Sequence, residues 1–186
     1  MTARRTVVVD CESTGLTDQA IAIEVAWWDL DTDKRGSFIP PHSEAWVREN
    51  GHPDALAING YLDRIAGQPQ DDGTETLRLH HALRGQCIAG ANVGRADCAW
   101  LVKMFRHAGL HPEPWHYRLG EIGPYAAGVL GLPLSEAPGL GDICDLMGVD
   151  AEPEVHTAAN GVTATGLALK ALMAKAGVTS TEGAAT

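Results

Sequence analysis

Apolar residues follow the pattern of β-strands in the first part of the chain. Residues 6–12, TVVVDCE, form a nearly continuous apolar run of the kind found in central strands. Residues 20–30 alternate well enough to predict a second strand, and residues 35–41 predict a third that ends at two prolines. Because the links are short and contain Asp, Thr, Gly and Lys, the three segments predict an antiparallel meander.

The rest of the chain changes to helical spacing. Helices are predicted over residues 53–65, 71–85, 95–109, 137–148 and 155–177. Thr74 is the expected cap of the second helix, and Gly109 ends the third. Short apolar segments at 86–92 and 115–122 predict two more strands. The pattern therefore predicts an α/β fold, with a mixed five-stranded sheet flanked by helices.

The organisation predicted is that of one domain. No internal repeat or long linker divides the chain, so residues 1–176 are expected to fold together, and the small polar residues 177–186 to form a flexible tail. The chain has 186 residues, 45% of them hydrophobic, and no apolar run long enough for a membrane span. The N-terminal MTARRTVVVD fits a first strand better than a signal peptide. The four cysteines form no CxxC pair, which favours free thiols in a reducing cytoplasm.

Charge limits the partners that the protein can bind. The net charge is −10, from 14 basic and 24 acidic residues, which argues against a protein that wraps long nucleic acid. It does not exclude an enzyme that grips only the end of a strand through metal ions, because divalent cations neutralise carboxylates and phosphate alike.

Two acidic residues lie at the end of the first predicted strand, with their side chains on the same face. Asp10 and Glu12 are two residues apart, and strand side chains alternate between faces. Like charges side by side destabilise a sheet. A positive group is therefore expected between them, or one of them should carry a proton.

Two further positions complete a candidate constellation. Asp97 lies on the first turn of a predicted helix, and His156 lies at the start of the last one. Taken alone, an acid at the position of Asp97 more often stabilises the helix through the helix dipole. A histidine at the position of His156 is more often a surface or capping residue. Together with Asp10 and Glu12, however, they suit a site that binds Mg²⁺ or Mn²⁺ through hard oxygen ligands and hydrolyses a phosphodiester. A histidine can take the proton from the attacking water.

Three motifs carry a resemblance to a known family. DCESTGL resembles the first motif of the DnaQ-like (DEDDh) 3′–5′ exonucleases, Asp-x-Glu-(Ser/Thr)-x-Gly-Leu. ANVGRADCAWL is similar to the second motif, and HTAANGVTATGLAL to the third, His-x-Ala-x-x-Asp-Ala. The resemblance covers residues 6–175, and the segments ALAINGY and WHYRL are similar to connecting pieces of phage and actinobacterial members. It implies a ribonuclease H-like fold.

The resemblance implies a role for each matched residue. Asp10 would bridge two Mg²⁺ or Mn²⁺ ions, Glu12 would ligate the first and Asp97 the second, and His156 would be the general base. The substrate-binding set would be Ser13, Thr14, Gly15, Leu16 and Asn92. The substrate would be the 3′ end of single-stranded DNA or RNA, and a protein partner is a further possibility.

One position departs sharply from the family pattern. The family carries a fourth metal-binding aspartate five residues after the histidine, where this chain has Gly161. Glycine offers no ligand, so only one of the two metals is expected to be held well. Asp142 and Asp145 precede the third motif, where a solvated helix face is favoured over a role as replacement ligands.

Smaller departures occur in the second motif. Asn92 and Asp97 are five residues apart instead of four, and Ala96 stands where the family usually has Phe. Near WHYRLGEI the family often has an aspartate, and Glu121 is the nearest carboxylate here. Two hypotheses follow: a metal-dependent 3′–5′ exonuclease weakened by Gly161, or an inactive DnaQ-like protein that binds a nucleic-acid end, a nucleotide or a protein partner.

Overall fold

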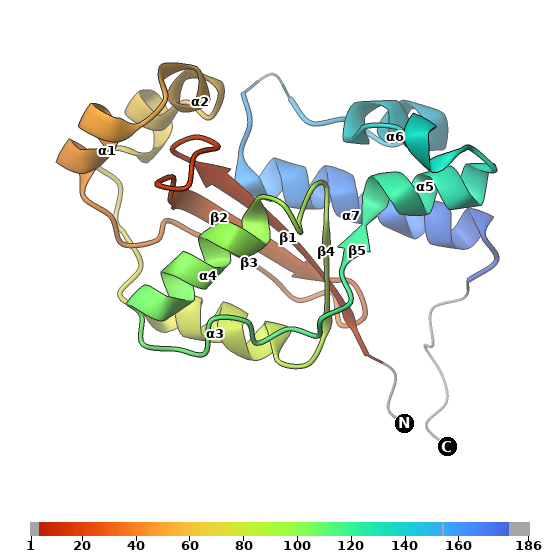
Figure 1. Ribbon diagram of the computed structural model, residues 1–186, viewed down its shortest axis with the longest axis horizontal. Coiled ribbons are helices and arrows are strands. Elements are labelled where there is room, and N and C mark those ends of the chain that lie inside the picture. The colour runs from red at the N-terminus through yellow and green to blue at the C-terminus, as the bar shows by residue number, and fades with distance from the viewer. Residues whose placement is uncertain (1–3, 154, 179–186) are drawn as a thin grey trace.

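A mixed five-stranded sheet organises the protein in its computed structural model, which describes residues 4–153 and 155–178 (Figure 1). The strands are β1 (Thr6–Ser13), β2 (Ala22–Asp29), β3 (Arg35–Phe38), β4 (Cys87–Gly90) and β5 (Gly120–Glu121). Their order is β3-β2-β1-β4-β5, so β1 is central, as its apolar run predicts. The first three strands form the predicted antiparallel meander, and β4 and β5 continue the sheet in parallel.

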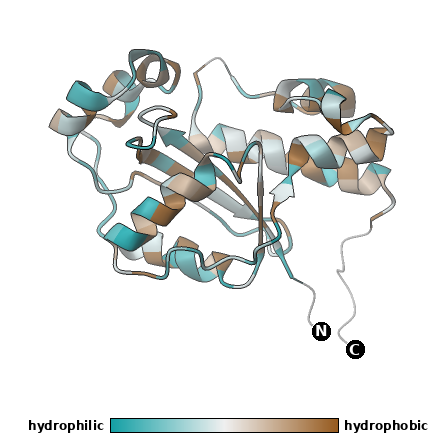
Figure 2. Cartoon of the chain, in the orientation of Figure 1, coloured by the Kyte–Doolittle hydropathy of each residue, from teal (hydrophilic) through white to brown (hydrophobic). Residues whose placement is uncertain are grey.

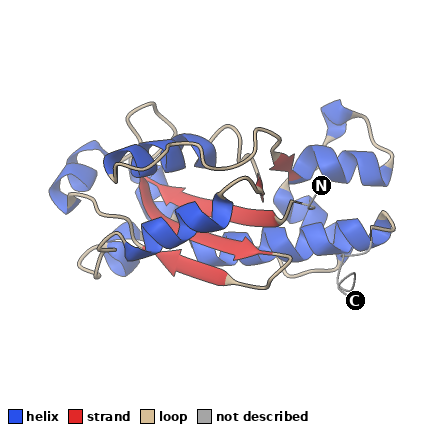
Figure 3. Cartoon of the chain, turned by 90° about the horizontal axis from the view of Figure 1, so that it is seen from below, coloured by secondary structure: helices blue, strands red, loops and turns tan. Residues whose placement is uncertain are grey.

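Helices cover both faces of this sheet (Figures 1 and 3). They are α1 (Glu44–Asn50), α2 (Pro53–Ile58), the π-helical η1 (Tyr61–Ile65), α3 (Thr74–Leu83), α4 (Asp97–His107), α5 (Ile122–Leu130), the 3₁₀ turn η2 (Leu134–Glu136), α6 (Leu140–Met147) and α7 (Ala158–Lys175). Helices α3 and α4 pack on one face, and α7 packs on the other together with α5 and α6. The α/β class with a mixed five-stranded sheet is confirmed.

Strand alternation divides the core into two layers. Val7 and Val9 of β1 pack toward α4, whereas Val8 packs with Trp28 toward α7. Hydrophobic colours follow the inner strands and the helices that cover them in Figure 2. Asp10 and Glu12 have the parity of Val8, so this alternation directs both carboxylates to the α7 face.

The region between β3 and β4 differs from the prediction. The single helix expected over residues 53–65 is interrupted at Gly60, whose φ of 61° is left-handed, so α2 and η1 are separate segments. Helix α1 was not predicted, although Ser43 caps it by accepting a hydrogen bond from the Trp46 N–H. Thr74 is the first residue of α3 and not its cap. The carboxylate of Asp71 accepts from the N–H groups of that helix's first turn instead.

The C-terminal half contains two further corrections. Only two residues of the strand expected over 115–122 pair with β4, and the chain then turns directly into α5. Helix α5 was not predicted because Pro124 and three glycines stand at positions 123–131, but its proline falls in the first turn, where proline is tolerated. His156 precedes α7 by two residues, and Thr157 caps that helix.

Other expectations concern the surface and the chain end. The four cysteines, all within the described residues, are free thiols. None of the helices formed by residues 4–153 and 155–178 is long and apolar enough to cross a membrane. Most of the tail predicted at 177–186 lies outside the described residues.

Candidate active site

Three carboxylates from two separate segments converge beside the end of β1. Asp10 and Glu12 come from that strand, and Asp97 is the first residue of α4. Asp97 is only 3% exposed, and it lies close enough for its charge to act on Asp10. The structure therefore brings together the acidic residues that the sequence motifs single out.

Burial and mutual repulsion set the electrostatics of these acids. Burial first, and then the charges of Asp97 and Glu12, hold the pKa of Asp10 well above its usual range. Burial, reinforced by the charges of Glu152 and Glu24, raises the pKa of Glu12 to about 7. Burial raises the pKa of Asp97 to about 7 as well. The cluster thus lacks enough positive charge of its own, which is the condition that a bound cation would relieve.

Arg64 neutralises a fourth acid of the same face. Glu24 on β2 stands directly opposite Glu12 in the antiparallel register. The guanidinium of Arg64 binds both oxygens of the Glu24 carboxylate, at 2.9 and 2.8 Å. Such a forked pair is strong and geometrically specific. Glu24 therefore brings its own counter-charge, whereas Asp10 and Glu12 do not.

The same arginine holds the chain next to His156. Arg64 also donates to the backbone carbonyls of Asn59, at 2.8 and 3.2 Å, and of His156, at 3.2 Å. The His156 N–H donates to the Ile58 carbonyl at 3.1 Å. These bonds connect η1 and the end of α2 to the loop before α7, and they fix where His156 lies.

Glu152 enters the cluster from that loop. Its Oε2 atom lies 3.5 Å from Nδ1 of His156. Ligand atoms of Glu12, Glu152 and His156 all lie within 4.8 Å of one another. Burial raises the pKa of Glu152, while the neighbouring imidazole opposes this. Asp142 and Asp145, the acids considered from the sequence, are exposed on α6, as predicted.

Gly161 faces the carboxylate of Asp10. It lies in the first turns of α7, and a β-carbon built on it would stand 2.5 Å from Oδ2 of Asp10. Position 161 is therefore directed at the acidic cluster, as the resemblance implies for the fourth ligand. The space that a longer side chain would need is occupied by Asp10.

The loop after β1 presents an exposed leucine. Ser13 and Thr14 are buried, and their hydroxyls bond within the loop, Ser13 to the Gly15 carbonyl at 2.9 Å and Thr14 from the Ile21 N–H at 3.1 Å. Gly15 has a φ of 143°, which favours glycine. Leu16 is 84% exposed at the tip. Leu16 thus offers an exposed apolar side chain on a loop whose Ser13 and Thr14 hydroxyls are already hydrogen-bonded.

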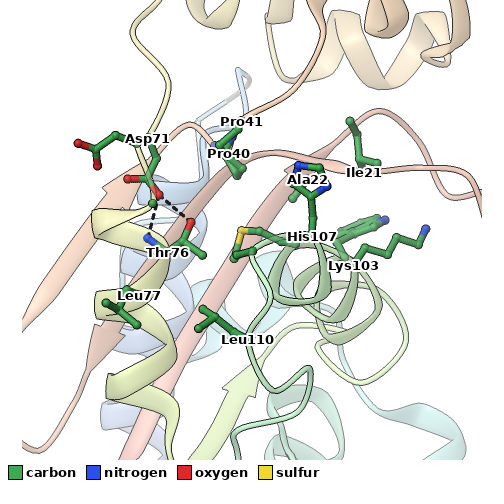
Figure 4. Close-up of a pocket in the computed structure, with 15 residues that line it drawn as sticks. Ile21, Ala22, Pro40, Pro41, Asp71, Thr76, Leu77, Lys103, His107 and Leu110 are labelled. Carbon is green, nitrogen blue, oxygen red and sulfur yellow. Dashed lines mark hydrogen bonds between the residues drawn. The ribbon is translucent and has the colours of Figure 1, made fainter.

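Among the cavities that the described residues form, two lie beside α4 and outside the acidic cluster. The smaller, of about 440 Å³, is lined by Leu16 and Asn92 together with Arg95, Trp100 and Lys103. The larger, of about 710 Å³, lies between α3, α4 and the end of β3 (Figure 4). None of Asp10, Glu12, Asp97 and His156 lines either cavity. The carboxylate cluster is therefore separate from both cavities, and the smaller cavity adjoins it through Ala96, which precedes Asp97.

The donor set fits a divalent metal ion. The cluster offers carboxylate oxygens, which are the hard ligands that Mg²⁺ and Mn²⁺ prefer. Oε1 of Glu152 is buried, and it has no hydrogen-bond partner among the residues that the structure describes. A buried oxygen without a partner is costly, and a cation beside it would satisfy it.

Sequence motifs missed three residues of this site. Glu24, Arg64 and Glu152 belong to no motif used for the prediction. Alternation along residues 20–30 and the hairpin would have placed Glu24 beside Glu12, since antiparallel register pairs the two strands. The expectation of a positive group between the acids is met only in part, because Arg64 lowers the pKa of Glu12 but pairs with Glu24.

Comparisons with known proteins agree with this architecture. No protein-family model matches the sequence, and no curated protein matches it. Solved structures do match, and the fold is the ribonuclease H-like fold found in exonuclease I. One is E. coli exonuclease I in complex with a dT13 oligonucleotide, with a TM-score of 0.71 and 18% identity over 92% of this chain and 41% of that one. Another is the zinc-bound form of the E. coli exonuclease I–single-stranded DNA complex, with a TM-score of 0.69 and 16% identity over 92% of this chain and 40% of that one.

These similarities show the fold. The chain spans about two fifths of the length of the exonuclease I structures, so most of those proteins has no counterpart here. At 16% and 18% identity the likeness concerns the path of the chain and not its side chains.

Proposed function

We propose that this protein is a metal-dependent 3′–5′ exonuclease of the DnaQ-like DEDDh type, similar to phage and actinobacterial members. It would hydrolyse phosphodiesters at the 3′ end of single-stranded DNA or RNA. The observation that carries the proposal is the meeting of Asp10, Glu12, Asp97 and His156 from three distant segments of the chain. The shared fold with exonuclease I, whose structures contain single-stranded DNA, supports it.

Asp10, Glu12 and Asp97 would hold Mg²⁺ or Mn²⁺. Such ions, when bound, polarise the phosphoryl oxygens and lower the pKa of attacking water. The oxygens of the three carboxylates already lie together in a buried cluster, so little reorganisation is needed when a metal ion binds. The elevated pKa values mean that a cation must displace protons, and binding is expected to strengthen as the pH rises above 7.

His156 would act as the general base. Its side chain is 47% exposed, and Nδ1 faces Glu152. Nε2 is therefore the nitrogen that would take the proton of the attacking water. Arg64 and the Ile58 carbonyl fix the backbone of His156, which keeps the imidazole beside the carboxylates.

Leu16 and Asn92 would receive the terminal nucleotide. Both line the smaller cavity, which joins the loop after β1 to the start of α4. Ser13, Thr14 and Gly15 would contribute through the backbone and through the rigidity of the loop, since both hydroxyls are already bonded within it.

The test uses 5′-labelled single-stranded DNA and RNA with Mg²⁺ or Mn²⁺. The expected result is a ladder that shortens from the 3′ end and releases 5′-mononucleotides. His156→Gln should lower the rate by about 10²–10⁴-fold, the usual contribution of general base catalysis, and Glu12→Gln should abolish it. His107→Gln is the control, because this exposed histidine lies on α4, away from the carboxylates. Equal degradation of a 3′-blocked strand would contradict exonuclease action.

Gly161 favours a second candidate, a DnaQ-like binding protein without turnover. A metal site that lacks one carboxylate could still hold a nucleic-acid end, a nucleotide or a protein partner. In that case the same oligonucleotides would bind in a metal-dependent way and remain intact for all four combinations of strand and ion.

A further inference from the structure

The loop between α6 and α7 places a carboxylate where no motif predicts one. Glu152 comes four residues before His156, whereas position 161 comes five residues after it. Its side chain is 16% exposed, so the loop directs it inward. Its neighbours Asp150 and Ala151 are exposed. The inward direction thus distinguishes Glu152 from Asp150, the nearest acid before it.

The two oxygens of Glu152 are in different situations. Oε2 lies 3.5 Å from Nδ1 of His156, a distance too long for a good hydrogen bond. Oε1 is buried, and no donor for it occurs among residues 4–153 and 155–178. Oε1 therefore lacks a partner, while the backbone N–H of Thr157 approaches the carboxylate and Glu12 brings a second carboxylate within 4.8 Å. A buried oxygen without a partner, next to a second carboxylate, is a position that a cation would satisfy.

The charges of the carboxylate cluster also favour a bound cation. Glu24 faces the site but is neutralised by Arg64. Among the described residues, the acids that then act on one another without a lysine or arginine partner are Asp10, Glu12, Asp97 and Glu152. Glu121 also lies near Asp97, but it accepts a hydrogen bond from the Gly94 N–H at 2.7 Å. Four carboxylates balance the charge of two divalent cations. Without Glu152 only three would be left, because position 161 is glycine.

We propose that Glu152 replaces the carboxylate that position 161 lacks, and that it holds a divalent cation together with Glu12. This deepens the proposed function and concerns the same site. Asp10 occupies the space beside Gly161, and the replacement oxygen comes from Glu152, close to Glu12 and His156.

A simpler role for Glu152 would be to orient His156 through their contact. The two roles differ in what each variant does to metal binding. A residue that only orients the general base, which is not itself a ligand, changes catalysis and leaves the affinity for a metal unchanged. A ligand changes the affinity itself. His156→Gln removes the contact and keeps Glu152, so under the proposal this variant retains its Mn²⁺.

The experiment measures Mn²⁺ binding by electron paramagnetic resonance, without substrate. Glu152→Gln should weaken binding by about tenfold or more, because even partners that only support a ligand contribute about that much. Asp150→Asn, the matched control on the same loop, should stay within about twofold, because an exposed charge is largely screened. Unchanged binding in Glu152→Gln, with binding lost in Glu12→Gln, would overturn the proposal.

Thermal unfolding gives a second readout that does not depend on activity. In EDTA, Glu152→Gln should unfold at a higher temperature than the parent protein, because it removes repulsion from the cluster. Saturating Mn²⁺ should raise the unfolding temperature of the variant by less than it raises that of the parent protein. The proposal would be overturned if Glu152→Gln unfolded at a lower temperature than the parent protein in EDTA and Mn²⁺ raised both unfolding temperatures equally. Glu152 would then have a structural role.

The two proposals fail in different ways. Oligonucleotide shortening that persists unchanged in Glu152→Gln, with unchanged Mn²⁺ affinity, removes this inference and leaves the exonuclease. Weaker Mn²⁺ binding in Glu152→Gln, with no shortening by the parent protein, keeps the inference and removes the exonuclease. Failure of the parent protein to bind Mn²⁺ at all would overturn the inference.

Discussion

Gly161 on α7 lies so close to Asp10 on β1 that a β-carbon at position 161 would stand 2.5 Å from Oδ2 of the aspartate. Real β-carbons do not approach another atom this closely. The helix can therefore keep its present place only while residue 161 is glycine or while the Asp10 carboxylate turns away. This contact couples the missing ligand to the position of a ligand that is present.

Restoring the aspartate should have opposite effects with and without metal. Gly161→Asp is expected to lower the free energy of unfolding in EDTA by about 1–3 kcal/mol, through overpacking and repulsion against Asp10. In the Glu152→Gln background it should restore Mn²⁺ binding, because the fourth carboxylate returns. Denaturant unfolding and Mn²⁺ titration measure the two effects.

The control for this change is Gly161→Asn. It has the same shape and no charge, so it should show the overpacking without the restored binding. Restoration by both variants would mean that shape, and not the carboxylate, governs the metal site.

Stability of the metal-free protein should fall as the pH rises. The pKa of Glu12 goes from an ordinary 4.5 to about 7 on folding, and that of Asp97 from 3.8 to about 7. Between these values the folded state binds more protons than the unfolded state, so the free energy of unfolding decreases with pH. The melting temperature in EDTA is therefore expected to drop from pH 5 to pH 8.

Metal ions should remove this pH dependence. At pH 8, Mn²⁺ replaces the lost protons and should raise the melting temperature, whereas at pH 5 it should have little effect. Glu12→Gln should flatten the profile in EDTA, because one of the titrating groups is gone. A melting temperature that rises steadily from pH 5 to pH 8 in EDTA would contradict the burial of these acids.

The fold was predictable where local pattern and tertiary role coincide. The apolar run of β1 indicated its central place, and alternation placed Asp10 and Glu12 on one face. The interruption at Gly60 was not predicted, because helical spacing continues on both sides of it. Helix α5 was missed because glycine and proline argue against a helix locally, while packing on α7 favours one.

The site was predictable only as far as its motifs extend. Arg64 is 40 residues from its partner Glu24, and nothing in either local sequence indicates the pair. Glu152 lies in an irregular loop without periodicity, and its direction depends on how α6 and α7 pack. Such residues are fixed by tertiary contacts, so a sequence pattern does not single them out.

The pair of Arg64 and Glu24 should be important for stability. The arginine side chain is 28% exposed and the glutamate 11%. Arg64→Gln leaves a nearly buried carboxylate without its partner, which is expected to cost about 3 kcal/mol. The double variant Arg64→Gln/Glu24→Gln should recover part of this loss, because the unpaired charge is then absent.

Arg48→Gln is the comparison for that measurement. Arg48 forms an exposed pair with Glu44 on α1 at 4.0 Å, and its loss should cost less than about 0.5 kcal/mol. Urea unfolding of the parent protein, Arg64→Gln, Glu24→Gln and their double variant gives the coupling energy of the buried pair, and Arg48→Gln is measured beside them. Equal losses in Arg64→Gln and Arg48→Gln would show that the buried pair contributes no more than a surface pair.

Leu16 should contribute to the binding of a single strand and not to the stability of the fold. Because it is 84% exposed, Leu16→Ala is expected to change the free energy of unfolding by less than about 0.5 kcal/mol. Burying a leucine side chain against a terminal base contributes about 1.5–3 kcal/mol, so the same variant should weaken binding of a short single strand about fivefold or more. Leu134→Ala is the matched control, because that leucine is 74% exposed on η2. Fluorescence anisotropy in Ca²⁺, which is expected to occupy the oxygen ligands with less turnover, compares the two, and equal affinities would remove Leu16 from the substrate site.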